Sequence, residues 1–231
     1  MEKTSLKKYL KSFKENTYEY HKVINSIITY TPKDGSILDV GCGYGQYLKP
    51  LHKQFPNVIG VETNKYIKES LQKEQLNVIT PEEFEKSEKQ FDTILMSHII
   101  EHFYPDELIA MMDSYLNHLK KGGHLIIATP TLNKNFFIDF DHKRPYYPTS
   151  IEEVFDGKHQ QVKSYSKNSL KIIKVWFRRS RLQINNSSLQ YNNKYTKNII
   201  TLTNILLAIL FRYSFQIIGT NSGWIGVFKK I

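Results

Sequence analysis

Residues 37–45, ILDVGCGYG, carry the strongest structural signal in this 231-residue chain. Apolar side chains at Ile37, Leu38 and Val40 predict a short buried strand, and glycines follow at alternate positions from residue 41. The next ten residues, QYLKPLHKQF, have apolar side chains at helical spacing. Glycines between a strand and a helix let the backbone turn sharply and let a ligand approach closely. The stretch therefore predicts a corner that binds a phosphate or a nucleotide.

The spacing of these glycines argues against a nicotinamide site. A dinucleotide fingerprint requires glycine at its first, third and sixth positions. Counted from Gly41, the sixth position is Gln46. Asp39 also places a charge two residues before the first glycine, where dinucleotide enzymes usually carry an apolar residue.

A second strand signal ends in an acidic residue. Residues 58–64, VIGVETN, have strand character up to Glu62, which lies twenty-one residues after Gly41 (62 − 41). An acid about twenty residues downstream, at the tip of the next strand, is placed to bind ribose hydroxyls. A carboxylate suits that task because its two oxygens accept hydrogen bonds from a vicinal diol.

Two further blocks predict neighbouring strands. Residues 91–103, FDTILMSHIIEHF, contain an apolar strand that runs into Ser97 and His98, and residues 120–130 read KKGGHLIIATP. We expect Gly122 and Gly123 to end a helix over residues 106–119 and the following run to be a strand. Because strands and helices alternate, the sequence predicts an α/β domain with a parallel sheet.

The first block resembles motif I of the class I S-adenosylmethionine (SAM)-dependent methyltransferases, xLDxGCGxG, and the other blocks follow in that family's order. The resemblance implies a Rossmann-like, seven-stranded, mostly parallel sheet with helices on both faces and an N-terminal helical cap. It implies SAM as the cofactor. Its expected ligands are Asp39, Gly41, Cys42, Gly43, Gly45, Glu62 and Ser97.

Two shorter motifs bear on the methyl acceptor. SHxxEH at residues 97–102 and DHKRPY at residues 141–146 are similar to stretches of bacterial surface-glycan methyltransferases. The resemblance implies O-methylation of a sugar, a glycan-linked molecule or another small substrate. We expect His142 to be the general base, because histidine titrates near neutral pH, with His98 as a second candidate.

The expected substrate residues are Asp141, Arg144 and Tyr146. Arg144 suits a phosphate or carboxylate on the acceptor. The alternative is that Asp141 and Arg144 form an ion pair that fixes the loop, with a structural role for His142.

The spacing of His98, Glu101 and His102 also allows a divalent metal, since positions i, i+3 and i+4 share one side of a helical turn. Ubiquinone-type O-methyltransferases carry an ExxEH block here, and in this chain His98 replaces its first acid. Most methyltransferases with SHxxEH work without metal, so we expect none.

Charge is distributed unevenly along the chain. The net charge is +10, and residues 157–231 contain thirteen Lys and Arg but no Asp or Glu. A basic segment favours a polyanionic partner, so we expect a substrate that is phosphorylated or lipid-linked, with nucleic acid less favoured. Two alternatives stay open: an RNA methyltransferase that uses the basic C-terminal third, and a SAM-binding scaffold without catalysis.

We expect a single domain over residues 1–231, with a helical N-terminal segment (1–30) and a substrate loop (131–150). A basic loop and an apolar helix (182–218) precede the last strand. Asn204 and Arg212 argue against a membrane span there, so a core or semi-exposed helix is favoured over an interfacial contact. The lone cysteine and the lack of a signal-peptide core predict a cytoplasmic protein, with peripheral contact at the inner membrane face as an option.

Overall fold

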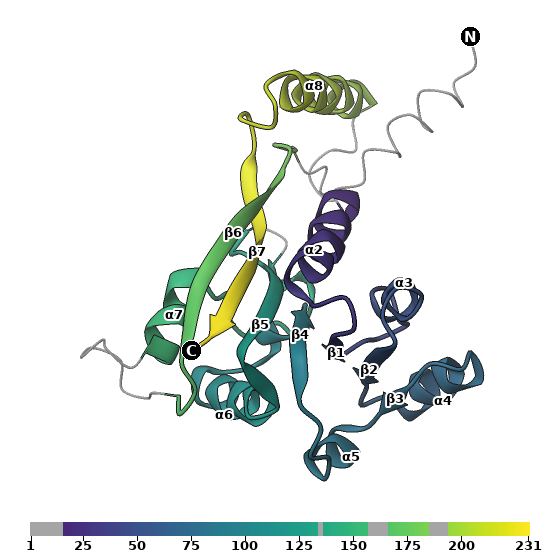
Figure 1. Cartoon of the computed structure of the whole chain (residues 1–231). Coiled ribbons are helices and arrows are strands. Elements are labelled where there is room, and N and C mark those ends of the chain that lie inside the picture. Colours follow the sequence, from purple (N-terminus) through teal and green to yellow (C-terminus); the bar gives the residue numbers. More distant parts are fainter. Residues whose placement is uncertain (1–15, 134–135, 157–165, 185–193) are drawn as a thin grey trace.

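The computed structural model describes residues 16–133, 136–156, 166–184 and 194–231 (Figure 1). Its strands are β1 (Ser36–Val40), β2 (Asn57–Val61), β3 (Val78–Ile79), β4 (Phe91–Ser97), β5 (Leu119–Pro130), β6 (Leu170–Ser180) and β7 (Thr220–Lys230). Its helices are α2 (Asn16–Tyr30), α3 (Leu48–His52), α4 (Lys65–Lys73), α5 (Pro81–Glu85), α6 (Pro105–Leu116), α7 (Pro148–Asp156) and α8 (Lys194–Tyr213). Two 3₁₀ turns complete the list, η1 (Ile100–His102) and η2 (Phe136–Ile138).

The strands form one seven-stranded sheet in the order β3-β2-β1-β4-β5-β7-β6. The first five strands run parallel, and β7 pairs antiparallel with both β5 and β6. This confirms the predicted Rossmann-like, mostly parallel sheet. The strand order reverses between β1 and β4, which is where open α/β sheets bind ligands beyond the carboxyl ends of their strands.

Helices cover both faces of the sheet, as expected (Figure 1). On one face, α2, α3 and α4 pack through buried residues such as Ile27, Leu51 and Leu71. On the other face, α5, α6 and α7 contribute buried apolar residues that include Phe84 and Met112. The central strands are almost continuously apolar because both of their faces are covered.

One expectation about the glycine pair was wrong. Helix α6 ends at Leu116, with Asn117 as its C-cap, so Gly122 and Gly123 do not end it. They lie inside β5, where the pairing with β4 jumps from Phe91 opposite Leu119 to Thr93 opposite His124. Gly122 has φ +79°, so the pair forms an irregularity in the strand rather than a helix cap.

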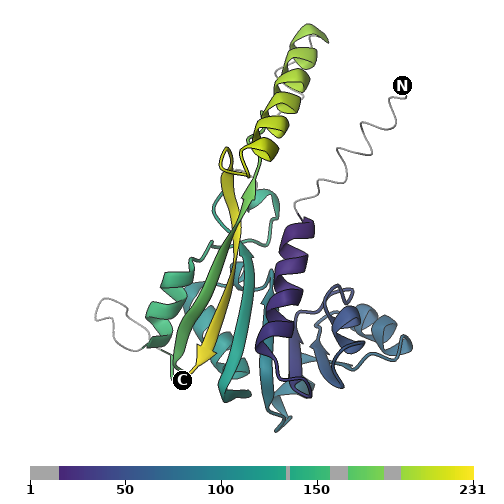
Figure 2. The ribbon, with the colours of Figure 1, turned by 45° about the horizontal axis from the view of Figure 1, so that its top comes forward.

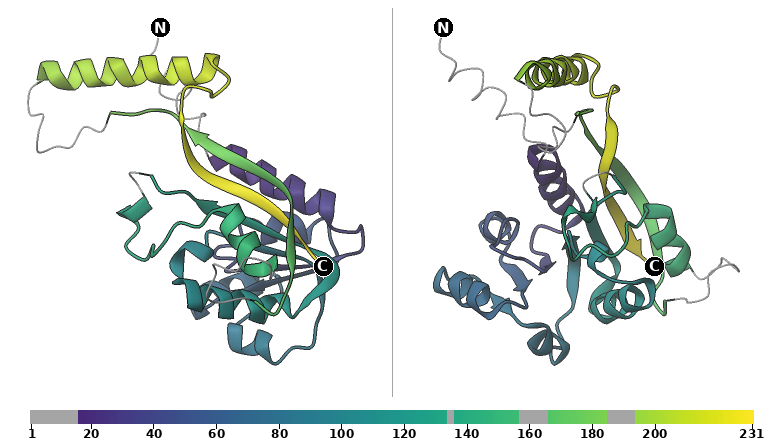
Figure 3. Two further views of the ribbon diagram at one scale, coloured as in Figure 1. Left: turned by 90° about the vertical axis from the view of Figure 1, so that its left-hand side faces the viewer. Right: turned by 180° about the vertical axis from the view of Figure 1, so that it is seen from behind.

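Strands β6 and β7 are long and extend beyond the rest of the sheet (Figure 2). Helix α8, which follows β6 in the chain, lies past the tip of this hairpin rather than on a face of the sheet (Figure 3). No described helix is long and apolar enough to cross a membrane. Of the N-terminal segment, α2 is described, whereas the amphipathic stretch expected around residues 6–13 lies outside the described residues.

Candidate functional site

The glycine turn follows β1 directly and takes the backbone through left-handed conformations. Gly41, Gly43 and Gly45 have φ values of +65°, +50° and +79°. A Cβ on Gly41 would lie 2.2 Å from Cδ1 of Ile99, whereas one on Gly43 would meet no atom within 4 Å. Gly43 therefore faces open space, and the turn leaves room for a ligand against its backbone.

Asp39, at the carboxyl end of β1, is 2% exposed. Its Oδ2 has no hydrogen-bond partner among the described residues. Burial, with a smaller contribution from the nearby Glu62, raises the pKa of this carboxyl to about 7. A buried carboxylate with an unused oxygen suits a cationic group that would enter beside it.

Glu62 follows β2 and supports the same turn. Its Oε2 accepts a hydrogen bond from the Gly43 N–H at 2.9 Å, and its Oε1 accepts one from the Asn64 N–H at 2.8 Å. A carboxylate offers about four acceptor positions, so further donors can still bind. Glu62 thus links the turn after β1 to the start of α4.

Two cavities meet at the carboxyl ends of β1, β2 and β4. The larger, about 670 Å³, lies between Glu62 and the side of α6 that includes Met111 and Tyr115. The smaller, about 370 Å³, is lined by Asp39, Gly43, Glu19 and Arg178 together with their neighbours. Gly41 and His98 line both cavities, so the two spaces adjoin at the end of β4.

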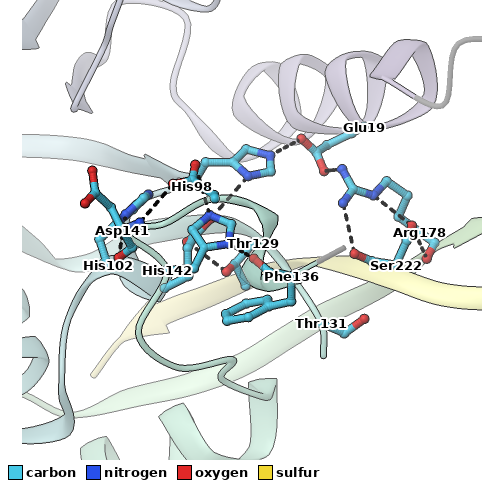
Figure 4. A network of polar contacts seen from close by, with 12 residues as sticks. Glu19, His98, His102, Thr129, Thr131, Phe136, Asp141, His142, Arg178 and Ser222 are labelled. Carbon is cyan, nitrogen blue, oxygen red and sulfur yellow. Dashed lines mark hydrogen bonds and ion pairs between the residues drawn. The ribbon is translucent and has the colours of Figure 1, made fainter. Parts of the chain in front are cut away.

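A polar network ties α2 to the sheet above the smaller cavity (Figure 4). Glu19 of α2 binds Nε2 of His98 at 2.7 Å through one oxygen and the Arg178 guanidinium of β6 through the other. Arg178 also donates to the Ser222 hydroxyl and carbonyl of β7. These bonds join α2, the end of β4, β6 and β7 around one buried carboxylate.

His98 stands between two carboxylates. Its Nδ1 lies 3.2 Å from Oε1 of the fully buried Glu101, whose Oε2 accepts a hydrogen bond from Thr129 at 2.9 Å. Burial lowers the pKa of the His98 ring, but the contacts with Glu101 and Glu19 outweigh it and raise this pKa to about 9. At neutral pH the ring is therefore an imidazolium, which does not suit a general base.

His142 lies beside this network in the loop between β5 and α7. Its Nδ1 lies 2.7 Å from the Phe136 carbonyl, to which it must donate because a carbonyl only accepts. In the neutral ring the Nε2 lone pair is then free, 3.7 Å from the Asp139 carboxylate. The His142 ring lies 4.9 Å from that of His102, which lines the larger cavity.

Glu101, His102 and His142 also form a cluster whose candidate ligand atoms lie within 4.8 Å of one another. The His102 Nδ1 lies 3.3 Å from the Asp141 carbonyl, which leaves its Nε2 free in the neutral ring. The set differs from the expected His98, Glu101 and His102, because His98 is held between the two carboxylates.

The expected substrate residues do not share one environment. Asp141 and Arg144 are exposed, and no ion pair joins them in the described structure. Arg144 lies over the ring of Tyr146, 5.6 Å from its centre. Tyr146 is buried, donates its hydroxyl to the Phe103 carbonyl and accepts the Trp224 N–H with its own carbonyl. Its side chain therefore packs in the fold rather than facing the cavities.

Two further expected cofactor residues lie at the smaller cavity. Cys42 is 6% exposed, and burial raises the pKa of its thiol to about 12, so it is an unreactive packing residue. Ser97 ends β4 beside His98, with a buried hydroxyl that has no partner among the described residues. Both residues therefore line the same smaller cavity as Asp39 and Gly43.

A family model described as a methyltransferase domain matches residues 12–178, well over half of the chain. The chain belongs to this methyltransferase domain family. The matched range includes the glycine turn, Glu62, the His142 loop and the network up to Arg178, whereas Ser222 lies beyond it.

Individual methyltransferases are similar to it over different lengths. The ubiquinone biosynthesis O-methyltransferase of Pelagibacter ubique (strain HTCC1062) is 32% identical over 133 residues, which are 54% of this chain and 52% of that protein. The chain therefore matches about half the length of this curated relative. The similarity supports the family and leaves the acceptor to be inferred.

Solved structures share the fold at low identity. A SAM-dependent methyltransferase from Archaeoglobus fulgidus is 20% identical with a TM-score of 0.58, covering 91% of this chain and 94% of that one. Magnesium protoporphyrin IX methyltransferase from Synechocystis PCC 6803, with bound SAM, is 12% identical with a TM-score of 0.57, covering 94% and 80%.

Sequence reasoning did not identify Glu19 as part of this methyltransferase's site. Glu19 lies on a helix that the sequence predicted only to cover the sheet. No spacing rule connects it to His98, which is 79 positions away in the chain. A weak signal existed: an acidic residue stands on a helix whose apolar positions Val23, Ile24 and Ile27 pack on the sheet. Arg178 was noted for its charge, not for its internal bonds.

Proposed function

We propose that this methyltransferase transfers the methyl group of SAM to an oxygen of a small acceptor, with a sugar or glycan-linked hydroxyl as the first acceptor class to test. The observation that carries the cofactor part is the buried Asp39, with its unused Oδ2, beside the open face of Gly43. The residues fit SAM because its ammonium group matches that oxygen and the glycine turn leaves room for it.

In the proposed site, Asp39 holds the ammonium group and Glu62 accepts hydrogen bonds from the ribose hydroxyls. Gly41, Cys42, Gly43 and Ser97 would form the wall against which the cofactor lies, and Gly45 would support that wall from the turn behind it. When bound, SAM supplies a methyl group on a positively charged sulfur. The surrounding residues contribute mainly by alignment, because fixing acceptor and donor in line removes much of the entropic cost of the reaction.

We assign the general base to His142. Its free Nε2 would take the proton that the acceptor hydroxyl loses as the oxygen bonds to the methyl carbon and the carbon–sulfur bond breaks, leaving S-adenosylhomocysteine. His98, held as an imidazolium by Glu19 and Glu101, is a positioning residue in this proposal. Arg144 and Asp141, both exposed on the same loop, would contact the acceptor.

A phenolic acceptor is a second candidate. It is favoured by the 32% identical relative, whose name places it in ubiquinone biosynthesis. The loop after β5 also exposes Phe137, Ile138 and Phe140, which suits an aromatic or apolar acceptor. RNA is less favoured, since two arginines of the basic cluster, Arg178 and Arg179, are engaged in internal hydrogen bonds.

Calorimetric titration of SAM and S-adenosylhomocysteine into the purified protein tests the cofactor site. Binding in the micromolar range is expected, and absence of binding to both compounds would overturn the site and favour a scaffold. Transfer of a radiolabelled methyl group from SAM to nucleotide sugars, to catechols and to total RNA then tests the acceptor class. Labelling of RNA alone would overturn the small-molecule proposal.

A further inference from the structure

Helix α8 presents an exposed apolar stripe. Its members follow one another at spacings of four, three, four, three and four residues, and each is 47–78% exposed: Tyr195, Ile199, Leu202, Leu206, Ile209 and Tyr213. This spacing places all six on one side of the helix. A helix of 20 residues is about 30 Å long, so the stripe runs the length of a sizeable surface.

Another side of α8 holds it to the β6–β7 hairpin. Ile200 is buried, and the Asn204 amide bonds both the N–H and the carbonyl of Ile184. Phe211 packs at Gly219 ahead of β7. The helix is thus fixed through these residues, and the exposed apolar stripe lies on a different side of it.

The stripe continues into the turn after the helix. Phe215 is 90% exposed and Ile217 is 73% exposed, and both precede β7. Because α8 lies past the tip of the hairpin, this apolar surface stands away from the two cores of the domain (Figures 2 and 3). A continuous exposed apolar surface of this kind marks an interaction site.

Charge identifies the partner. Residues 157–231 carry thirteen Lys and Arg and no acidic residue, so α8 itself has only basic charges, on Lys194, Lys197 and Arg212. Pairing with α8 of a second copy would bring only like charges together, with no acid on either helix to offset them. A membrane with anionic lipids has an apolar interior beneath negatively charged headgroups. It therefore matches both the apolar stripe and the basic charge of this part of the chain.

We propose that α8 lies in the interface of a membrane that contains anionic lipids, with its apolar stripe in the acyl boundary and the acid-free, basic C-terminal third of the chain attracted to the headgroups. The aromatic ends of the stripe, Tyr195 and Tyr213, suit the headgroup level, where an apolar ring and a hydroxyl are both satisfied.

Vesicle flotation with the full chain tests the proposal. Vesicles of phosphatidylcholine alone are compared with vesicles containing about a quarter phosphatidylglycerol. We expect binding to the anionic vesicles, and about tenfold or more weaker binding for Leu206→Glu, which puts a charge into the stripe. Thr201→Glu adds the same charge to an exposed position of α8 off the stripe and is expected to change the binding by less than about threefold.

Two other measurements keep the test decisive. Leu206→Trp is expected to shift the fluorescence to shorter wavelength when anionic vesicles are added, relative to the same titration of the wild type. Light scattering after gel filtration reports the oligomeric state. No wild-type binding to anionic vesicles, or equal loss in both Glu variants, would overturn the proposal. A dimer that Leu206→Glu dissociates, without vesicle binding, would assign the stripe to a second copy instead.

Discussion

Glu19 and His98 lie 79 residues apart in the chain, yet Oε1 of the first and Nε2 of the second are 2.7 Å apart. This contact joins helix α2 to the end of β4, where the two cavities meet. His98 also has a positive φ of 57°, an uncommon conformation for a residue with a side chain. The contacts of its ring with the carboxylates of Glu19 and Glu101 stabilise this conformation.

The His98 pKa predicts a pH-dependent stability. Because this pKa is raised to about 9 in the folded protein, the charged ring stabilises the fold fully below about pH 6.5 and loses that effect as the pH rises through about 9. The ring is partly exposed, so solvent screening limits the change to about 1 kcal/mol. Denaturant unfolding between pH 6 and pH 9.5 measures it.

Glu19→Gln is expected to reduce this pH dependence and to lower the free energy of unfolding by about 2 kcal/mol, since Arg178 loses its charged partner. Glu74→Gln, which removes the exposed Lys49–Glu74 pair, is the matched control and should leave the pH profile unchanged. An unchanged profile for Glu19→Gln as well would rule out the network as its cause.

The glycine turn offers a matched pair of substitutions. Gly43 and Gly122 both have positive φ, and a Cβ on either meets no atom closer than 4.0 Å. Replacing either with Val should cost about 2 kcal/mol of stability through backbone strain. Only Gly43 lines a cavity, so Gly43→Val should weaken SAM binding at least about thirtyfold, and Gly122→Val should leave it within about twofold. Calorimetry measures the SAM affinity of both variants. Equal losses of affinity would show that the glycine turn does not contact the cofactor.

Asp39 predicts how SAM binding depends on pH. Its raised pKa of about 7 means that the carboxylate becomes protonated, and loses its attraction for the SAM ammonium, as the pH falls below that value. The Kd of SAM should therefore rise about eightfold from pH 7.5 to pH 6. Asp39→Asn should bind more weakly and show little of this slope. A wild-type Kd that is constant over this range would argue against contact between Asp39 and the ammonium group.

The sequence predicted the centre of the sheet well because β1, β2 and β4 are short apolar runs that end in glycine, acid or Ser-His signals. The predicted end of the helix before β5 was wrong because Gly122 and Gly123 were read as a helix cap. A glycine pair is equally compatible with an irregularity inside a strand. The polar network was beyond sequence reasoning, because Glu19 meets His98 and Arg178 only through tertiary packing. The burial of Tyr146 depends in the same way on contacts with Phe103 and Trp224, which are distant in the chain.

His142 gives the sharpest test of the proposed chemistry. His142→Gln removes the basic Nε2 and is expected to lower kcat by about a hundredfold or more, with the Kd of SAM within about twofold, because the residue lines neither cavity. His52→Gln, on the exposed surface of α3, is the control and should leave both constants unchanged. If the cluster with Glu101 and His102 acted through a divalent ion, a chelator would reproduce the His142→Gln loss in the wild-type enzyme. Turnover that withstands the chelator and falls in the variant would assign the proton transfer to the side chain itself, whereas full activity of the variant would exclude His142 as the base.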